Sequence, residues 1–261
     1  MTRVLAVTTS MGTKWEAYSQ AMLKTVIPEW ERCIVDGRKG WSPTLFIESI
    51  IDRDAEYIVH VDEDCFVESR NALLELVSFL NENPGIVAAG IPDGGHYYRD
   101  HNPAALNLFF VIFRMDSLRT AWKEKERWNT LQFRDEFKKD VLRQCRDLDQ
   151  NRVQWDEAEP YYPLFWSLLN SGGRFLYLNH TLEEKRWATQ VSMPSGKILA
   201  EHLWYLRQWF SNDVMPGHNC PNRLRYELLR TRLLKRHRKS IWFKMVLTWM
   251  QSKRLARRLF C

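Results

Sequence analysis

The sequence lacks the features of a membrane-spanning or secreted protein. None of its apolar runs reaches the roughly 18 residues that a transmembrane helix requires. A predicted strand, Arg3-Val-Leu-Ala-Val7, begins at once, so we expect no signal peptide before it. The five cysteines (33, 65, 145, 220 and 261) are odd in number and far apart. They match neither a zinc-binding spacing nor a disulfide framework, which favours a reducing compartment.

Glycine-rich phosphate-binding loops are also missing. Neither a Gly-x-Gly-x-x-Gly nor a Walker sequence occurs in the 261 residues. A nucleotide bound by this chain would therefore need a metal ion, rather than a glycine-rich loop, to hold its phosphates. The hydrophobic content of 45% and the charged content of 27% are typical of a soluble globular protein.

The charges are unevenly distributed along the chain. Residues 222–261 contain thirteen Lys or Arg and one acid, whereas the whole chain carries a formal net charge of only +6. The preceding residues are therefore net acidic, and we treat the basic tail as a separate segment.

The stretch Tyr57-Ile-Val-His-Val-Asp-Glu-Asp-Cys-Phe-Val67 places three consecutive acids between two apolar runs. The first run predicts a buried strand, and the acids must emerge at the sheet edge because buried unpaired carboxylates are costly. In extended backbone, Asp62 and Asp64 point to one side and Glu63 to the other. Two such carboxylates favour a Mg²⁺ or Mn²⁺ site with a phosphate beyond it. The alternative is an ordinary polar turn.

The stretch from Ala55 to Asp64 resembles the strand and Asp-x-Asp motif of GT-A glycosyltransferases. That resemblance implies a divalent metal, Mn²⁺ or Mg²⁺, held by Asp62 and Asp64 on a nucleotide-sugar diphosphate. It implies a UDP-sugar as the favoured donor, with a GDP-sugar as the alternative.

Alternating strand and helix patterns over the first hundred residues predict a Rossmann-type half. Helices are expected after the capping residues Thr13, Ser42 and Ser69. The resemblance places Thr8, Thr9 and Asp36 at strand ends that contact the nucleoside. Asp36 is followed by glycine, so a simple turn is an equal alternative.

The second half is expected to open with a strand over 107–113 and to continue as charged helix over 116–149, with Phe133, Phe137, Val141 and Leu142 as its apolar stripe. The acids Asp156, Glu157 and Glu159 then precede a short helix. Their order resembles the GT-A acidic motif that supplies the catalytic base of inverting members. We favour Glu157, then Asp156, although acids at a helix start are also simply favourable electrostatically.

Two histidines compete for the role of a late metal ligand. His202 lies where many GT-A enzymes have a third ligand, and His180 is the alternative. A structural role is the default for either one.

These observations predict a mixed α/β, GT-A-like chain with a nucleotide-sugar and metal half (1–100), an acceptor half (101–221) and a basic helical tail (222–261). The expected activity is metal-dependent sugar transfer to a glycan or lipid-linked acceptor in polysaccharide or lipopolysaccharide-type synthesis. Inversion of the anomeric centre is favoured, and retention is the alternative. The alternatives are a sugar-phosphate nucleotidyltransferase and a non-enzymatic basic adaptor for lipid or RNA. The first usually has an arginine-containing glycine-rich loop, which residues 8–12 do not provide.

The tail combines leucines at helical spacing over 224–234 with an aromatic-rich segment over 241–250. Basic residues are attracted to anionic lipid, and aromatic side chains favour the membrane interface. We therefore expect a cytoplasmic protein held peripherally on the inner face of the membrane, with no nucleic acid as partner. The alternative is a helical appendage packed on the domain.

Overall fold

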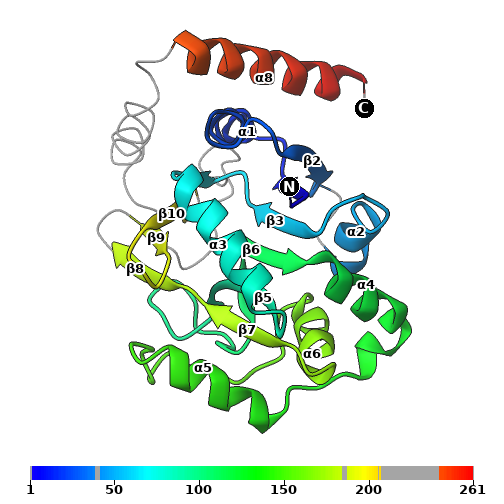
Figure 1. The fold of residues 1–261 in the computed structure, drawn as a ribbon, viewed down its shortest axis with the longest axis vertical. Coiled ribbons are helices and arrows are strands. Elements are labelled where there is room, and N and C mark those ends of the chain that lie inside the picture. The colour runs from blue at the N-terminus through cyan, green and yellow to red at the C-terminus, as the bar shows by residue number, and fades with distance from the viewer. Residues whose placement is uncertain (1, 39–41, 184–186, 205, 207–240, 261) are drawn as a thin grey trace.

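The computed structural model describes residues 2–38, 42–183, 187–204, 206 and 241–260, and it has the mixed α/β architecture expected from the sequence (Figure 1). The strands are β1 (Val4–Ser10), β2 (Glu31–Asp36), β3 (Tyr57–Val61), β4 (Cys65–Val67), β5 (Ile86–Pro92), β6 (Leu106–Arg114), β7 (Arg174–Tyr177), β8 (Asn179–Glu183), β9 (Ala188–Ser192) and β10 (Ile198–Leu203). The helices are α1 (Lys14–Val26), α2 (Pro43–Glu48), α3 (Arg70–Glu82), α4 (Met115–Lys123), α5 (Lys138–Gln144), α6 (Tyr162–Asn170) and α8 (Ile241–Phe260).

A six-stranded mixed sheet in the order β2-β1-β3-β6-β5-β7 forms the centre of the fold. β1 pairs in parallel with β2 and β3, as strand–helix–strand units require. β6 runs antiparallel to its neighbours β3 and β5, and β5 pairs in parallel with β7. Since β6 comes from the expected second half, both halves contribute to one sheet.

Helices cover both faces of this sheet. Leu5 and Val7 of β1 pack into a core with α2, α4 and α6, whereas Val4 and Ala6 pack into a second core with α1 and α3. The alternation follows from the two-residue period of a strand whose two faces are both buried.

A second, antiparallel sheet in the order β4-β10-β9-β8 packs beside the first. Its core residues, among them Val191 and Leu199, share a cluster with α3 and with β3. β10 pairs with β4 so that His202 lies opposite Cys65. This pairing brings β10 next to the acidic stretch 62–64, although more than a hundred residues of sequence separate them.

The predicted helix starts at Thr13, Ser42 and Ser69 are confirmed, because each side chain accepts a hydrogen bond from a backbone N–H of the first turn. The spacing of Thr13 and Glu16 is typical of a capping box, but the reciprocal contact from Glu16 to the N–H of Thr13 does not form. Thr13 accepts from Trp15 N, and Glu16 instead accepts a hydrogen bond from Ser10 at 2.6 Å. The glutamate is thus directed toward the end of β1.

The predicted continuous helix over 116–149 is wrong. The chain forms α4, two 3₁₀ turns (Lys125–Thr130 and Asp135–Phe137) and the short α5. Phe137 and Val141 are buried as predicted, but Leu142 is exposed. Aromatic packing of Phe133 against Trp155 and Trp166 competes with helix continuation in this region.

The last helix, α8, packs against α1 at the edge of the molecule (Figure 1). Val246 and Met250 are buried in a cluster that includes Trp15 and Met22 of α1. The leucines predicted to form a helix over 224–234, and the expected boundary at 221, lie outside the described residues. Among the residues that are described, no helix has the length and apolar character needed to cross a bilayer.

Candidate functional site

A pocket of about 290 Å³ lies where β1, β3 and β10 end. Four of the residues singled out from the sequence line it together: Thr9, Asp62, Glu159 and His202. They come from four separate segments of the chain. The remaining lining residues are Met11, His60, Arg99, Asn107, Leu108, Phe109, Pro160, Tyr161 and Trp204.

One lining residue of the pocket is a hydrogen-bonded histidine, His60, near the end of β3. Nδ1 of His60 lies 2.5 Å from the carbonyl oxygen of Leu108, so this nitrogen must carry the proton and donate it. In the neutral ring Nε2 is then an acceptor, and the hydroxyl of Thr9, 2.8 Å away, donates to it. His60 thereby orients the Thr9 side chain at the pocket wall.

The acidic stretch forms a turn rather than extended backbone. The N–H of Cys65 donates to the carbonyl oxygen of Asp62 at 3.0 Å, which closes a β-turn over 62–65. The prediction that Asp62 and Asp64 face the same side by strand alternation is therefore wrong in its premise. Asp62 lines the pocket, whereas the buried carboxylate of Glu63 accepts hydrogen bonds from Ser10 and Thr13.

Asp64 is buried beneath the pocket beside His202. Nε2 of His202 lies 3.4 Å from Oδ1 of Asp64, and neither ring nitrogen of His202 has a hydrogen bond among the described residues. The imidazole is held by stacking on Phe109, with ring centroids 4.1 Å apart, and by an edge contact with Trp204. The turn and the β4–β10 pairing together create this Asp–His pair.

This pair has the chemistry of a metal site, since carboxylate and imidazole both suit Mn²⁺. Within the described part of the chain, however, no group of three or more His, Cys, Asp or Glu side chains is arranged to hold a metal ion. A divalent cation at Asp64 and His202 would need further ligands from a bound phosphate, as is usual for Mg²⁺ in nucleotide sites. His180 lies apart from the pocket, with its ring 5.8 Å from that of His96.

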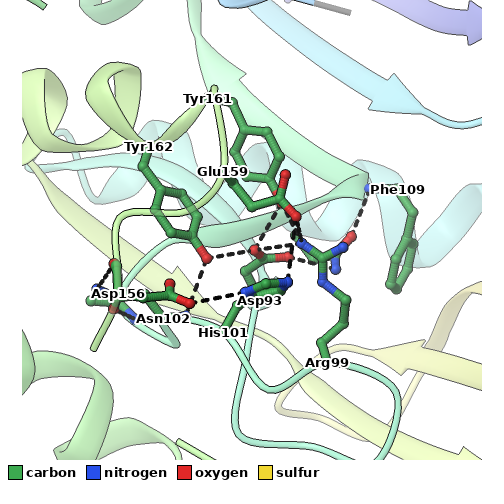
Figure 2. A network of polar contacts seen from close by, with 11 residues as sticks. Asp93, Arg99, His101, Asn102, Phe109, Asp156, Glu159, Tyr161 and Tyr162 are labelled. Carbon is green, nitrogen blue, oxygen red and sulfur yellow. Dashed lines mark hydrogen bonds and ion pairs between the residues drawn. The ribbon is translucent and has the colours of Figure 1, made fainter. Parts of the chain in front are cut away.

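Figure 2 shows the carboxylate of Asp93 at the centre of a polar network beside the pocket. Asp93 follows β5 directly and is fully buried. It accepts hydrogen bonds from the hydroxyls of Tyr161 and Tyr162, both at 2.8 Å, from Arg99 at 3.0 Å and from Asn107 at 2.7 Å. Four donors thus satisfy the oxygens of the buried carboxylate.

Arg99 extends the network from Asp93 to the acids of the second half. Its guanidinium donates to Glu159 at 2.5 Å and also to the hydroxyl of Tyr161. Nδ1 of His101 donates to Asp156 at 3.1 Å, and its Nε2 lies 3.6 Å from Glu159 (Figure 2). Two of the three candidate acids, Asp156 and Glu159, thus contact the loop that carries Arg99 and His101.

The charges and hydrogen bonds of the network act against the effect of burial on the pKa values of Asp93 and Arg99. Burial leaves the pKa of the Asp93 carboxyl above its usual value, although Arg99 and the hydroxyls of Tyr161 and Tyr162 oppose this rise. For Arg99, burial alone would lower the pKa, but the charges of Asp93 and Glu159 raise it above the usual value of a guanidinium. Arg99 is therefore a permanent cation at the pocket wall.

The structure separates the three acids that the sequence could not distinguish. Glu159 lines the pocket, whereas Asp156 does not line it and accepts a hydrogen bond from His101. The carboxylate of Glu157 accepts a hydrogen bond from the backbone N–H of Phe133. Glu157, the residue favoured from the sequence, is absent from the described residues that line the pocket.

Thr8 and Asp36 also lie away from the pocket. Thr8 is buried and accepts a hydrogen bond from Gln20 at 2.7 Å. Asp36, at the end of β2, forms an ion pair with Arg38 at the surface, at 2.6 Å. Asp36 therefore has the turn-associated environment that was the alternative to nucleoside binding.

Sequence reasoning missed His60, Asp93 and Arg99. A histidine inside an otherwise apolar strand was a signal for His60, because a buried imidazole needs hydrogen-bond partners. Asp93 stands immediately after a strand and before two glycines, which is where α/β sheets place functional side chains. Nothing in the local sequence distinguishes Arg99 from the many surface arginines.

No protein-family model and no curated protein matches this sequence. Among solved structures, the chain is similar to a glycosyltransferase involved in the glycosylation of the major capsid of PBCV-1 (13% identity, 58% of this chain and 79% of that chain, TM-score 0.33). It is also similar to mouse xyloside xylosyltransferase 1 (12% identity, 68% of this chain and 85% of that chain, TM-score 0.32). A third is CMP:2-keto-3-deoxy-manno-octonic acid synthetase complexed with CTP (9% identity, 67% of this chain and 89% of that chain, TM-score 0.34). These scores show no family.

Proposed function

We propose that this chain is a glycosyltransferase that uses a nucleotide-sugar donor and a divalent cation. The observation that carries the proposal is the single pocket that gathers Thr9, Asp62, Glu159 and His202. A polar pocket at the ends of sheet strands, with a carboxylate from each half of the chain, suits a diphosphate on one side and an acceptor hydroxyl on the other.

The donor side of the pocket would be formed by the ends of β1 and β3. Thr9, oriented by His60, offers its oxygen to the nucleoside. Asp62, Asp64 and His202 are the candidate ligands of Mn²⁺ or Mg²⁺, and oxygens of the diphosphate would have to complete the coordination, because the described side chains alone do not form a three-residue metal site. A divalent cation there supplies charge neutralisation for the nucleoside diphosphate leaving group. A UDP-sugar is the favoured donor and a GDP-sugar the alternative.

Glu159 is proposed as the catalytic base. A sugar hydroxyl becomes an effective nucleophile when a carboxylate accepts its proton, and that carboxylate must face the reacting groups. Glu159 lines the pocket and forms an ion pair with Arg99. Direct attack by the acceptor oxygen would then displace the diphosphate and invert the anomeric centre.

The acceptor is proposed to be a glycan or a lipid-linked sugar, in polysaccharide or lipopolysaccharide-type synthesis at the inner face of the membrane. This proposal is supported by the basic tail, in which residues 241–261 contain five Lys or Arg and no acid. Basic segments of this kind are attracted to anionic lipid surfaces.

The test is a thermal-shift panel of nucleoside diphosphates, each with and without Mn²⁺. We expect one base to raise Tm in a Mn²⁺-dependent manner, because a ligand that binds only the folded state stabilises it. Asp62→Asn should abolish the shift. Asp54→Asn, an exposed acid of similar chemistry, is the matched control and should keep it. If no diphosphate gives a metal-dependent shift, the donor assignment is wrong; a response to nucleoside triphosphates alone would favour a nucleotidyltransferase.

A further inference from the structure

The two long sides of α8 are both apolar, but among the described residues only one of them packs against the rest of the protein. Val246 and Met250 are buried against α1, and the guanidinium of Arg254 donates two hydrogen bonds to the carbonyl oxygen of Gly12, at 2.9 and 3.3 Å. These residues follow one another at four-residue spacing and so lie on one side of the helix. That side fixes α8 on the domain.

The opposite side exposes a stripe of large apolar side chains. Ile241, Met245 and Trp249, also at four-residue spacing, are 77%, 61% and 45% exposed, and Leu255 is 56% exposed. We call these four residues the outward face of α8. Contiguous exposed apolar side chains on a protein surface usually mark a site of interaction.

Polar groups on the outward side are arranged to tolerate an apolar environment. The hydroxyls of Thr248 and Ser252 donate to the helix carbonyls of Lys244 and Thr248, at 3.0 and 3.1 Å. A hydroxyl that already donates to the backbone loses less when it leaves water. At about 100° of rotation per residue, Lys244 and Lys253 fall on opposite borders of the apolar stripe. Nζ of Lys253 lies 4.2 Å from the ring centroid of Trp249.

We propose that the outward face of α8 docks on an anionic lipid bilayer. An apolar stripe with a tryptophan, bordered by lysines on both sides, matches a helix that lies in the plane of the interface. The absence of any acid from residues 241–261 complements a negatively charged surface. A second copy of this chain would fit less well, because a two-fold contact between outward faces brings like charges together.

Docking would also bring the bilayer close to the proposed donor site. Arg254 ties α8 to Gly12, and the neighbouring Met11 lines the pocket. An acceptor anchored in the bilayer would then be presented beside the pocket. This last step rests on the proposed transferase function, whereas the docking itself does not.

The experiment is vesicle flotation of the full chain with phosphatidylcholine alone and with two parts phosphatidylcholine to one part phosphatidylglycerol, at low and high salt. We expect binding to the mixed vesicles only, weakened by salt. Trp249→Glu and Met245→Glu should each lower partitioning at least roughly tenfold, since each replaces an apolar contact by a repelled charge. The matched control is Leu142→Glu, which places the same charge at an exposed leucine of α5 and should bind as the wild type.

A second pair of variants tests the charge contribution without disturbing apolar packing. Lys244→Gln combined with Lys253→Gln should lower partitioning by roughly thirtyfold, from about 1 kcal/mol for each basic residue. Absence of wild-type binding to the mixed vesicles, or unchanged binding in all outward-face variants, would overturn the docking proposal. So would a dimer that Trp249→Glu dissociates, because the occupant would then be a second copy. The Mn²⁺-dependent nucleotide shift, measured in each variant, reports separately on the proposed function and on folding.

Discussion

Glu159→Gln is the substitution that most directly tests the proposed chemistry. Gln keeps the size of the side chain and a carbonyl acceptor for Arg99, but it cannot take a proton from an acceptor hydroxyl. If Glu159 is the base, turnover should fall by roughly 10²–10⁴-fold while the affinity for the donor nucleotide changes little. Glu159 lines the pocket, so the substitution acts on the site itself.

The expected cost to folding is small by comparison. Arg99 keeps its hydrogen bonds to Asp93 and Tyr161 after the substitution. The lost interaction is the charge of one partly exposed carboxylate, for which we expect about 1 kcal/mol. A loss of that size leaves the protein folded at 25 °C, so a kinetic effect of several orders of magnitude cannot come from unfolding.

The assay is nucleoside diphosphate release from the donor identified by the thermal-shift panel, with the dissociation constant of that diphosphate measured in parallel. Glu157→Gln is the matched control, because Glu157 belongs to the same acidic cluster but contacts the backbone N–H of Phe133 instead of the pocket. Its turnover should stay within about threefold of the wild type, as for most substitutions away from a reacting group. Near-normal turnover in Glu159→Gln, or a loss in Glu157→Gln as large as that expected of the base, would refute the assignment.

Three further predictions follow from the buried groups. Asp64→Asn should abolish the Mn²⁺ dependence of nucleotide stabilisation in the thermal-shift assay while the fold is kept; a full shift in that variant would exclude Asp64 as a ligand. Asp93→Ala should lower the free energy of unfolding in urea by roughly 3–5 kcal/mol, because Arg99 and three other donors lose their buried acceptor; a loss below about 1 kcal/mol would contradict the network. Burial lowers the pKa of His96 from 6.5 to about 3. Below about pH 6.5 His96 is therefore protonated in the unfolded chain but not in the folded chain, so the free energy of unfolding falls as the pH is lowered. Between pH 7 and pH 5 this contribution is about 2 kcal/mol, and His96→Gln should remove that part of the pH dependence in urea titrations.

Much of the first half was predictable because its signals are local. Apolar runs identify β1, β3 and β5, and capping residues such as Ser42 and Ser69 identify where helices begin. Thr9 and Asp62 could be recognised because each stands near the end of a strand, and strand ends in an α/β sheet meet at one edge. These features depend on a few neighbouring residues, so they can be read from the sequence.

The geometry of the acids depended on contacts that the sequence does not display. Asp62 and Asp64 were expected to face one side, but the backbone turns between them and buries Asp64 against His202. That turn is stabilised by β4 and its pairing with β10, which joins residues far apart in the chain. Local propensity carries little information about such long-range pairing.

The tertiary structure also decided which acid of the second half faces the pocket. Asp156, Glu157 and Glu159 are alike in sequence and near one another, and only the loop that carries Arg99 and His101 directs Glu159 into the pocket and holds Asp156 behind it. For α8, the sequence determined an amphipathic basic helix, whereas packing on α1 decided which apolar side is buried and which remains on the surface. Composition and periodicity specify how many apolar faces a helix has; only the position of its neighbours decides which of them meets the solvent.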